Sequence, residues 1–423
     1  MGVHVVSDID VQDFGSEFVK IGDLNGDGAP DVLFVQSVYE TREITCLTAT
    51  TISGQVLWQV GTPSADHGRI YSDLPAQIYD WDGDGENEVL YVKQAAYLDP
   101  VLLGGWARER ALKYGGDATM VVLDATTGAE KGRFAIPPAA DDCFLFADLT
   151  GRGRRQDLVV KDRYWNMWGI SFEGDVLWHW SGSTGHFPAV GDVDRDGRDE
   201  VFVGFALIDH DGTVLFQKDA QDAHQDAVTM VQLSDRSWRL AFGNSGIYCL
   251  GVDGQERWHH PLAEAQHVVV GRFREDTEVQ FMVLDRGQPE GDRRGPSVLY
   301  LYDLHGHEIW RRIQPEGSAL AAMVELNWTG DGATQQLLVY NRGPDEPIVV
   351  YDGEGRIIDA LLPYEPSRNS ADQRAGYYCT RADVWGDSRD EVILFGSRLA
   401  RICVNSRPLA ISTHYNQTLY PGM

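Results

Sequence analysis

Residues 185–226 read GHFPAVGDVDRDGRDEVFVGFALIDHDGTVLFQKDAQDAHQD and contain one complete repeat of this chain. An apolar strand leads into the acidic, glycine-rich loop 192–197, and a second apolar strand covers residues 200–207. A tight turn at residues 209–212 then leads to a third strand that ends near Phe216. Short apolar runs separated by tight turns, with no 3.6-residue period, predict β-strands rather than helices.

Eight copies of this unit recur along the chain. They begin near residues 15, 73, 141, 185, 223, 265, 318 and 375. Each copy is followed by a second hairpin, and several of these hairpins end in a tryptophan, namely Trp58, Trp178, Trp258 and Trp310. Four short strands per unit are typical of a β-propeller, in which a large ring can wedge between neighbouring blades. We therefore predict an all-β, eight-bladed β-propeller with four-stranded blades, forming a single domain over residues 1–423.

The last copy lacks a clear fourth strand after residues 399–404. The apolar run at residues 2–6 is free to supply it. Pairing of the two ends of the chain would close the ring and remove the open sheet edge. We expect the N-terminal strand to complete the last blade.

Composition excludes several classes of partner. The formal net charge of −28 disfavours nucleic acid and anionic membrane surfaces. No window approaches the roughly 18 consecutive apolar residues of a membrane span. The first residues lack the basic patch and apolar core of a signal peptide, so we expect a cytoplasmic protein or a secreted one whose leader has been removed. The five cysteines occur singly, which argues against a disulfide framework or a thiolate zinc site.

Three of the eight loops place oxygen ligands at alternate positions, with another carboxylate four residues after the third ligand. Hard cations take roughly six to eight oxygen ligands, so this spacing predicts bound Ca²⁺; the alternative is an Asx-rich turn without an ion. The predicted ligands are Asp23, Asn25, Asp27 and Asp31 in the first repeat, Asp80, Asp82, Asp84 and Glu88 in the second, and Asp192, Asp194, Asp196 and Glu200 in the fourth. The third repeat carries Arg152 and Arg154 where acids should be, and we expect no ion there.

Histidines precede the innermost strands of three consecutive repeats at similar offsets. Counted back from the first loop position, these residues are His186 at six residues, His224 and Asp226 at eight and six, and His267 at five. Residues just before the innermost strand of a propeller face the central axis, so these side chains are expected to meet. Two imidazoles and a carboxylate favour a divalent metal site, with zinc or manganese suited to the imidazole ligands, and His267 beside it as a base or third imidazole.

Further polar and aromatic residues are expected at the same mouth. Arg374 and Tyr378 are predicted to act in catalysis, with Arg374 binding a carboxylate and Tyr378 stacking on a sugar or supplying a proton. The predicted substrate contacts are Asp142, Arg163, Tyr164, Trp165 and Tyr377.

Taken with these features, several runs of residues resemble the family-11 rhamnogalacturonan lyases. These runs are GHFPAVGDVDRDGRDEV (185–201), ALIDHDGTVLF (206–216), AHQDAV (223–228), ADVWGDSRDEVILF (382–395) and HYNQTLYPG (414–422). The resemblance covers most of the chain in pattern and implies an eight-bladed, calcium-rich propeller.

The resemblance also implies a calcium ion at the mouth of the cleft, bound by two His, an Asp and a Glu. The first three match His186, His224 and Asp226. The Glu has no clear counterpart, because the chain reads FGNSG at residues 242–246. The family's arginine in the next blade is replaced by His267, and its catalytic lysine has Arg374 as the nearest substitute.

We therefore predict a lyase that cleaves a uronate-containing, rhamnogalacturonan or pectin-type glycan by metal-assisted β-elimination. A cation on the uronate carboxylate makes the proton on C5 more acidic, and His267 is the predicted base. The expected partner is an acidic polysaccharide or oligosaccharide. The alternatives are a glycoside hydrolase acting on related oligosaccharides and a non-catalytic calcium-binding propeller that binds carbohydrate or protein.

Overall fold

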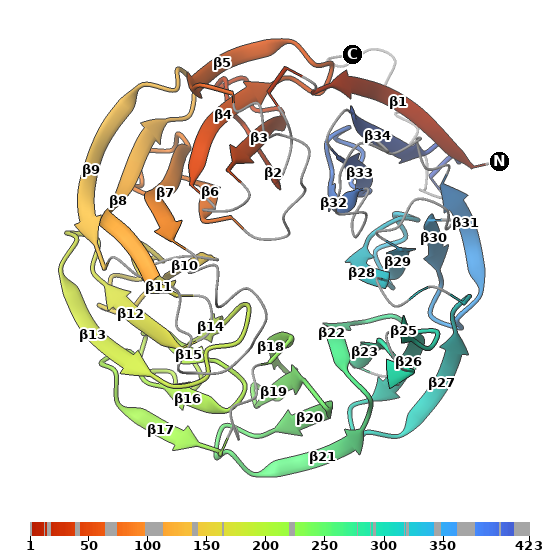
Figure 1. The fold of residues 1–423 in the computed structure, drawn as a ribbon. Helices are drawn as coiled ribbons and strands as arrows, with labels where there is room; N and C mark the ends of the chain where they lie inside the picture. The colour runs from red at the N-terminus through yellow and green to blue at the C-terminus, as the bar shows by residue number, and fades with distance from the viewer. Residues whose placement is uncertain are drawn as a thin grey trace, which may run out of the picture.

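A ring of β-sheets surrounds a central axis in the computed structural model of this chain (Figure 1). The structure describes residues 2–11, 13–14, 18–38, 43–63, 74–97, 113–137, 143–162, 165–219, 225–276, 278–287, 289–290, 293–316, 318, 321–341, 348–361, 377–396 and 399–409. The ordered elements of these residues are all β-strands, so they include no helix that could span a membrane.

Each blade is a four-stranded antiparallel sheet whose strands follow chain order from the axis to the rim, except that the N-terminal strand forms the rim of the last blade. Blades one to four comprise β2 (Phe18–Gly22), β3 (Asp31–Ser37), β4 (Ile44–Thr50) and β5 (Val56–Gly61); β6 (Ala76–Tyr79), β7 (Glu88–Tyr97), β8 (Lys113–Asp124) and β9 (Glu130–Ile136); β10 (Phe144–Ala147), β11 (Asp157–Lys161), β12 (Asn166–Ile170) and β13 (Val176–Ser181); and β14 (Ala189–Gly191), β15 (Glu200–Phe202), β16 (Ala206–Ile208) and β17 (Val214–Gln217).

The second half of the chain repeats this arrangement. Its strands are β18 (Ala227–Gln232), β19 (Trp238–Gly243), β20 (Gly246–Leu250) and β21 (Glu256–Pro261); β22 (Ala265–Gly271), β23 (Gln280–Asp285), β26 (Val298–Asp303) and β27 (Glu308–Ile313); β28 (Ala321–Leu326), β29 (Gln336–Asn341), β30 (Ile348–Tyr351) and β31 (Ile357–Leu361); and β32 (Tyr378–Ala382), β33 (Glu391–Phe395), β34 (Leu399–Asn405) and β1 (Val3–Asp10). A small hairpin of β24 (Pro289–Glu290) and β25 (Arg293–Arg294) is inserted in blade six. The predicted eight-bladed propeller with four-stranded blades is confirmed.

The N-terminal strand closes the ring, as predicted. β1 pairs with β34 along its length, from Val3 opposite Asn405 to Asp10 opposite Leu399, and so extends beyond the expected residues 2–6. The Arg401 guanidinium donates two hydrogen bonds to the Asp8 carboxylate, at 2.7 and 2.8 Å. The extent of the domain to residue 423 stays a prediction, because the last residues lie outside the described part of the chain.

Tryptophans of the outer strands lock neighbouring blades together. In four blades the indole N–H donates to a carbonyl in the last turn of the next blade, at 2.6 to 3.0 Å. The donor and acceptor residues are Trp58 and Ala125, Trp178 and His210, Trp258 and Leu304, and Trp310 and Gly353. In the turn that Trp258 contacts, Gly306 has a φ of +84°, and a Cβ there would stand 2.6 Å from the ring. The turn therefore requires glycine both for its backbone and for the space that the indole fills.

A second repeated contact ties the acidic loop to its own blade. In seven blades the first residue of the second strand carries a buried side-chain oxygen that accepts the backbone N–H of a residue at the start of the loop, at 2.6 to 3.0 Å. We call these the anchor residues; they are Asp31, Glu88, Asp157, Glu200, Gln280, Gln336 and Glu391, each at most 3% exposed. Blades six and seven use a neutral amide for this role, so the hydrogen bond itself does not require a charge.

All five cysteines are buried thiols. They lie in or next to strands of four different blades, where a small apolar side chain packs well.

Replacement of Trp258 by alanine is expected to lower the free energy of unfolding by about 3–5 kcal/mol, because the buried ring and its hydrogen bond to Leu304 are both lost. Urea denaturation followed by circular dichroism measures the change. Ile313→Ala is the control: this side chain at the end of β27 is 73% exposed, and its loss should change stability by less than about 0.5 kcal/mol. Equal effects of the two substitutions would contradict the wedging role of the indole.

Candidate functional site

A cavity of about 1300 Å³ opens on the axis of the ring. Its walls come from the innermost strands β2, β18, β22, β28 and β32 and from the residues that precede β14. These strands belong to different blades and meet only at the axis (Figure 1). Side chains that lie far apart in the sequence are therefore brought to one wall.

Four of the predicted site residues line this cavity: His186, Asp226, His267 and Tyr378. All four are half-buried. The first three come from the entrances to blades four, five and six, which are consecutive blades of the ring. The arrangement predicted from their offsets therefore places these side chains at a common cavity.

Backbone and amide contacts fix these entrance residues to one another. The Cys143 thiol lies 3.6 Å from the His186 carbonyl, and the His186 N–H donates to the Gln225 carbonyl at 3.2 Å. The Gln266 amide then donates to the Asp226 carboxylate at 3.2 Å. A chain of contacts thus runs from blade three to blade six along the rim of the cavity.

Other predicted residues do not line it. Tyr377 is 1% exposed and packs in the core between blades seven and eight, because its side chain points to the opposite face from that of Tyr378. Trp165 lies at the start of β12, where its backbone N–H donates to Asp162 at 2.6 Å, and it is not among the residues of the cavity wall. Five further predicted site residues lie outside the described part of the chain, namely Asp142, Arg163, Tyr164, His224 and Arg374.

Glu264 and Arg286 also line the cavity and were not singled out from the sequence. They form an ion pair at 3.2 Å. Asp285, which is 6% exposed, organises this corner by accepting the backbone N–H groups of Ala263, Glu264 and Gly287 at 2.8 to 3.2 Å. The sequence did contain a pattern that could have identified Glu264. This residue lies eight positions before Arg272, which is the same offset that identified His224.

Two more cationic side chains reach the cavity. Lys20, in the middle of β2, is half-buried, and its ammonium lies 4.9 Å from the centre of the Phe18 ring. Burial lowers the pKa of Lys20 to about 8, since the charged amine has lost part of its hydration. Arg381 is held at the wall by Glu325, at 2.8 Å, and by Asp390, at 3.5 Å. The cavity therefore combines imidazoles, carboxylates and cations.

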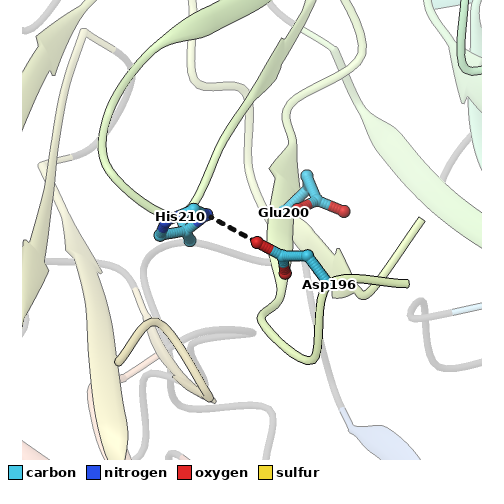
Figure 2. A group of neighbouring side chains, drawn as sticks. All are labelled: Asp196, Glu200 and His210. Atoms are coloured by element: carbon cyan, nitrogen blue, oxygen red, sulfur yellow. Dashed lines mark ion pairs between the residues drawn. The ribbon is translucent and has the colours of Figure 1, made fainter. Parts of the chain in front are cut away.

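Compact groups of three metal-ligand side chains lie in the acidic loops. Among the described residues, such groups within 4.8 Å occur in blades two and four but not at the cavity. They are Asp80, Asp82 and Glu88; Asp192, Asp194 and Glu200; and Asp196, Glu200 and His210. In the last group His210 comes from the turn between β16 and β17, and its Nδ1 lies 3.7 Å from the Asp196 carboxylate (Figure 2). His210 is a further residue that the loop spacing alone could not reveal.

The remaining predicted ligands belong to the loop of blade one. The Asp23 carboxylate accepts the N–H groups of Asn25, Gly26 and Gly28, and Asp27 accepts that of Ala29. Asp31 is the buried anchor of this loop, and burial raises the pKa of its carboxyl group.

Residues 160–419 match the family model for "Rhamnogalacturonan lyase family 11, C-terminal domain". The chain belongs to this family. The matched segment runs from the end of β11 to beyond β34 and thus includes the entrances of blades four to eight.

Relatives in this family include two proteins of Bacillus subtilis strain 168. Rhamnogalacturonan endolyase YesW is 20% identical and rhamnogalacturonan exolyase YesX 22% identical, each over 247 residues. These alignments span 48% of this chain and only 40% of either relative. The crystal structure of YesW superposes with a TM-score of 0.63 at 18% identity, covering 96% of this chain and 74% of the other. That likeness shows a common fold.

The fold also occurs outside the lyases. The Vibrio cholerae biofilm matrix protein Bap1 superposes with a TM-score of 0.60 at 13% identity, over 96% of this chain and 92% of that one. A propeller of this kind therefore does not by itself indicate catalysis.

Asp285→Ala is expected to loosen the corner that holds Glu264 and Arg286. The substitution leaves three backbone N–H groups without their acceptor, at a cost of about 1–3 kcal/mol. Hydrogen–deuterium exchange should show faster exchange of the Ala263 and Glu264 amides. Asp285→Asn keeps one acceptor oxygen and should have the smaller effect, and unchanged exchange in the alanine variant would refute the role given to Asp285.

Proposed function

We propose that the chain is a polysaccharide lyase that cleaves a rhamnogalacturonan or pectin-type glycan by β-elimination in the central cavity. The observation that carries this proposal is the common position of His186, Asp226 and His267 at one cavity, in a chain that belongs to rhamnogalacturonan lyase family 11. Rhamnogalacturonan cleavage is the activity named for YesW and YesX, to which it is similar.

The cavity suits a polymer that carries carboxylates. The protein as a whole has a net charge of −28 and would repel a polyuronide. Lys20, Arg286 and Arg381 provide local positive charge at the cavity wall, although Glu264 and Glu325 offset part of it. An amine near a partly apolar wall binds a carboxylate more strongly than the same amine in water.

We propose a divalent cation at the entrances of blades four and five. His186 offers an imidazole and Asp226 a carboxylate, while Glu264 supplies a second carboxylate to the same cavity. A cation bound there would neutralise the uronate carboxylate and make the C5 proton more acidic. Calcium is the proposed ion, with zinc or manganese as alternatives because imidazole takes part.

His267 is the proposed base. Its imidazole lines the cavity from β22, one blade away from Asp226. In the elimination it takes the proton from C5, the electron pair forms the C4–C5 double bond, and the glycosidic oxygen on C4 departs with its electrons. Tyr378, on the wall formed by β32, is placed to donate a proton to that oxygen.

For the acidic loops we propose structural Ca²⁺ at blades one and four. Their predicted ligands are hard oxygens, and the glycines at positions 26, 28 and 197 adopt positive φ, which lets the loops curl around an ion.

A non-catalytic carbohydrate-binding propeller is the second candidate, and the likeness to Bap1 is what favours it. The two candidates differ in product. Elimination leaves an unsaturated uronate that absorbs in the near ultraviolet, whereas binding leaves the glycan intact. Incubation with rhamnogalacturonan I, with and without a chelator, separates them: rising absorbance supports the lyase, and retention on immobilised glycan without absorbance supports the binding module.

His267→Ala is expected to lower kcat about 10²- to 10⁴-fold, the usual contribution of a general base. The absorbance assay on rhamnogalacturonan I measures it. His307→Ala is the matched control in the same blade, because this imidazole is 79% exposed on an outer turn. If the His267 variant keeps the activity of the control, His267 is not the base.

Lys20 should make substrate binding depend on pH. Its pKa of about 8 lies below the ordinary value of about 10.5, so the ammonium is charged below pH 8 and loses its charge as the pH rises through 8. KM for a uronate polymer is therefore expected to rise above pH 8. Lys20→Met should raise KM at pH 7 and abolish this dependence, while Lys20→Arg should keep KM low above pH 8; an unchanged profile in both would exclude the role.

A further inference from the structure

The acidic loop of blade two already holds a cation that belongs to the protein. The Lys131 ammonium, from β9, lies 2.6 Å from the buried Glu88 carboxylate, 2.9 Å from Asp82 and 3.6 Å from Asp84. Hydrogen bonds to Glu88 and Asp82 raise the pKa of Lys131, so the amine stays charged. Its position among three carboxylates is the one that a metal ion in this loop would take.

The fourth predicted ligand of this loop is also paired. Arg154 of blade three donates to the Asp80 carboxylate at 3.0 Å. Each of Asp80, Asp82, Asp84 and Glu88 thus pairs with a cationic side chain. These ion pairs are an alternative to the calcium ion predicted at the same four residues.

Blade four has the same loop spacing without such a partner. No ion pair with lysine or arginine occurs at Asp192, Asp194, Asp196 or Glu200 among the described residues. Glu200 is completely buried, and while its Oε2 accepts the Val193 N–H at 2.6 Å, its Oε1 has no hydrogen-bond partner. The Arg198 guanidinium, next to the loop, instead hydrogen-bonds to His210 Nε2 at 2.7 Å.

An unpartnered buried carboxylate is costly, and the hydrogen bond it makes does not explain its charge. Gln280 and Gln336 make the same anchor contact in blades six and seven with a neutral amide. The extra charge of Glu200 therefore points to a ligand. Its carboxylate shares a 4.8 Å group with Asp192 and Asp194 and another with Asp196 and His210 (Figure 2).

The register of the outer strands explains the difference between the two blades. In blade two the pairing shifts between Val122–Gly132 and Leu123–Glu130, which leaves Lys131 as the bulged residue. In blade four the shift falls between Leu207–Phe216 and Ile208–Val214, so the bulged residue is Leu215. A lysine and a leucine thus occupy the same position, and only the lysine can neutralise the loop.

We propose that Lys131 is a tethered cation that takes the place of a metal ion in the loop of blade two, in contrast to the loop of blade four, where Asp192, Asp194, Asp196 and the buried Glu200 have no such competitor for the structural Ca²⁺ proposed above. Hard carboxylate oxygens make Ca²⁺ the expected ion. His210 stands beside this site as an imidazole that a softer ion would recruit. The proposal concerns ion binding and does not depend on lyase activity.

Exchange of the bulged residues tests it. The chelator-treated full chain is titrated with Ca²⁺ by calorimetry, and bound calcium is counted by elemental analysis after gel filtration. Lys131→Leu should gain about one equivalent of Ca²⁺ relative to the wild type, because the four carboxylates of blade two lose their ammonium. Leu215→Lys should lose about one equivalent, because the new amine occupies the loop of blade four.

Glu200→Gln keeps the anchor hydrogen bond, as blades six and seven do naturally, and should also lose about one equivalent while remaining folded by circular dichroism. Lys93→Leu, an exposed lysine of β7, is the control for loss of charge in blade two. The tethered-cation assignment is overturned if folded Lys131→Leu gains no ion or if Lys93→Leu gains one as well. The site in blade four is overturned if folded Glu200→Gln and Leu215→Lys both bind as much Ca²⁺ as the wild type.

Discussion

The buried oxygen at the start of each second strand is the contact on which the blades depend. It reaches back over the loop to a backbone N–H at the loop's entrance and is present in seven of the eight blades. Without it, a loop of several polar residues would join two apolar strands with unpaired backbone groups close to the core. Neutral glutamines make the same contact in blades six and seven, so acidic spacing alone does not decide whether a loop holds an ion.

What varies among the blades is how the charge of the anchor residue is compensated. Glutamine avoids the charge in blades six and seven. In blade three Asp157 accepts several donors, among them the Thr150 hydroxyl at 2.7 Å and the Phe172 N–H at 2.9 Å. Glu88 meets an ammonium, whereas burial raises the pKa of Glu200 to about 8, as expected for a carboxylate without a compensating cation nearby. The anchor position thus carries a neutral amide, a carboxylate with several hydrogen-bond donors, a carboxylate paired with an ammonium, or a carboxylate without a compensating cation.

Much of this molecule could be predicted from local patterns. The number of blades, the strand order and the pairing of the two chain ends follow from repeats of turn and strand signals, which act over a few residues. His186, Asp226 and His267 could be placed together because a ring converts equal offsets into a shared position. The same reasoning could not separate Tyr377 from Tyr378. Adjacent residues of a strand point to opposite faces, so only one of the two can line the cavity.

Residues that act across the fold could not be found in this way. Lys131 lies 43 residues after Glu88 and on a different strand, and its role depends on a bulge that no local pattern specifies. The lowered pKa of Lys20 likewise depends on burial of its side chain in the folded ring, which no local pattern specifies. Glu264 is an intermediate case, because its offset matched that of His224 but its side chain did not resemble the histidines being sought.

The pairing of β1 with β34 also bears on how the chain acquires its structure during synthesis. β1 is synthesised before the other strands of this ring, and its partner β34 follows only after almost four hundred further residues. Until then β1 presents unpaired backbone groups. Such an edge invites pairing with other chains, so the ring stays open to misassembly until β34 has been made.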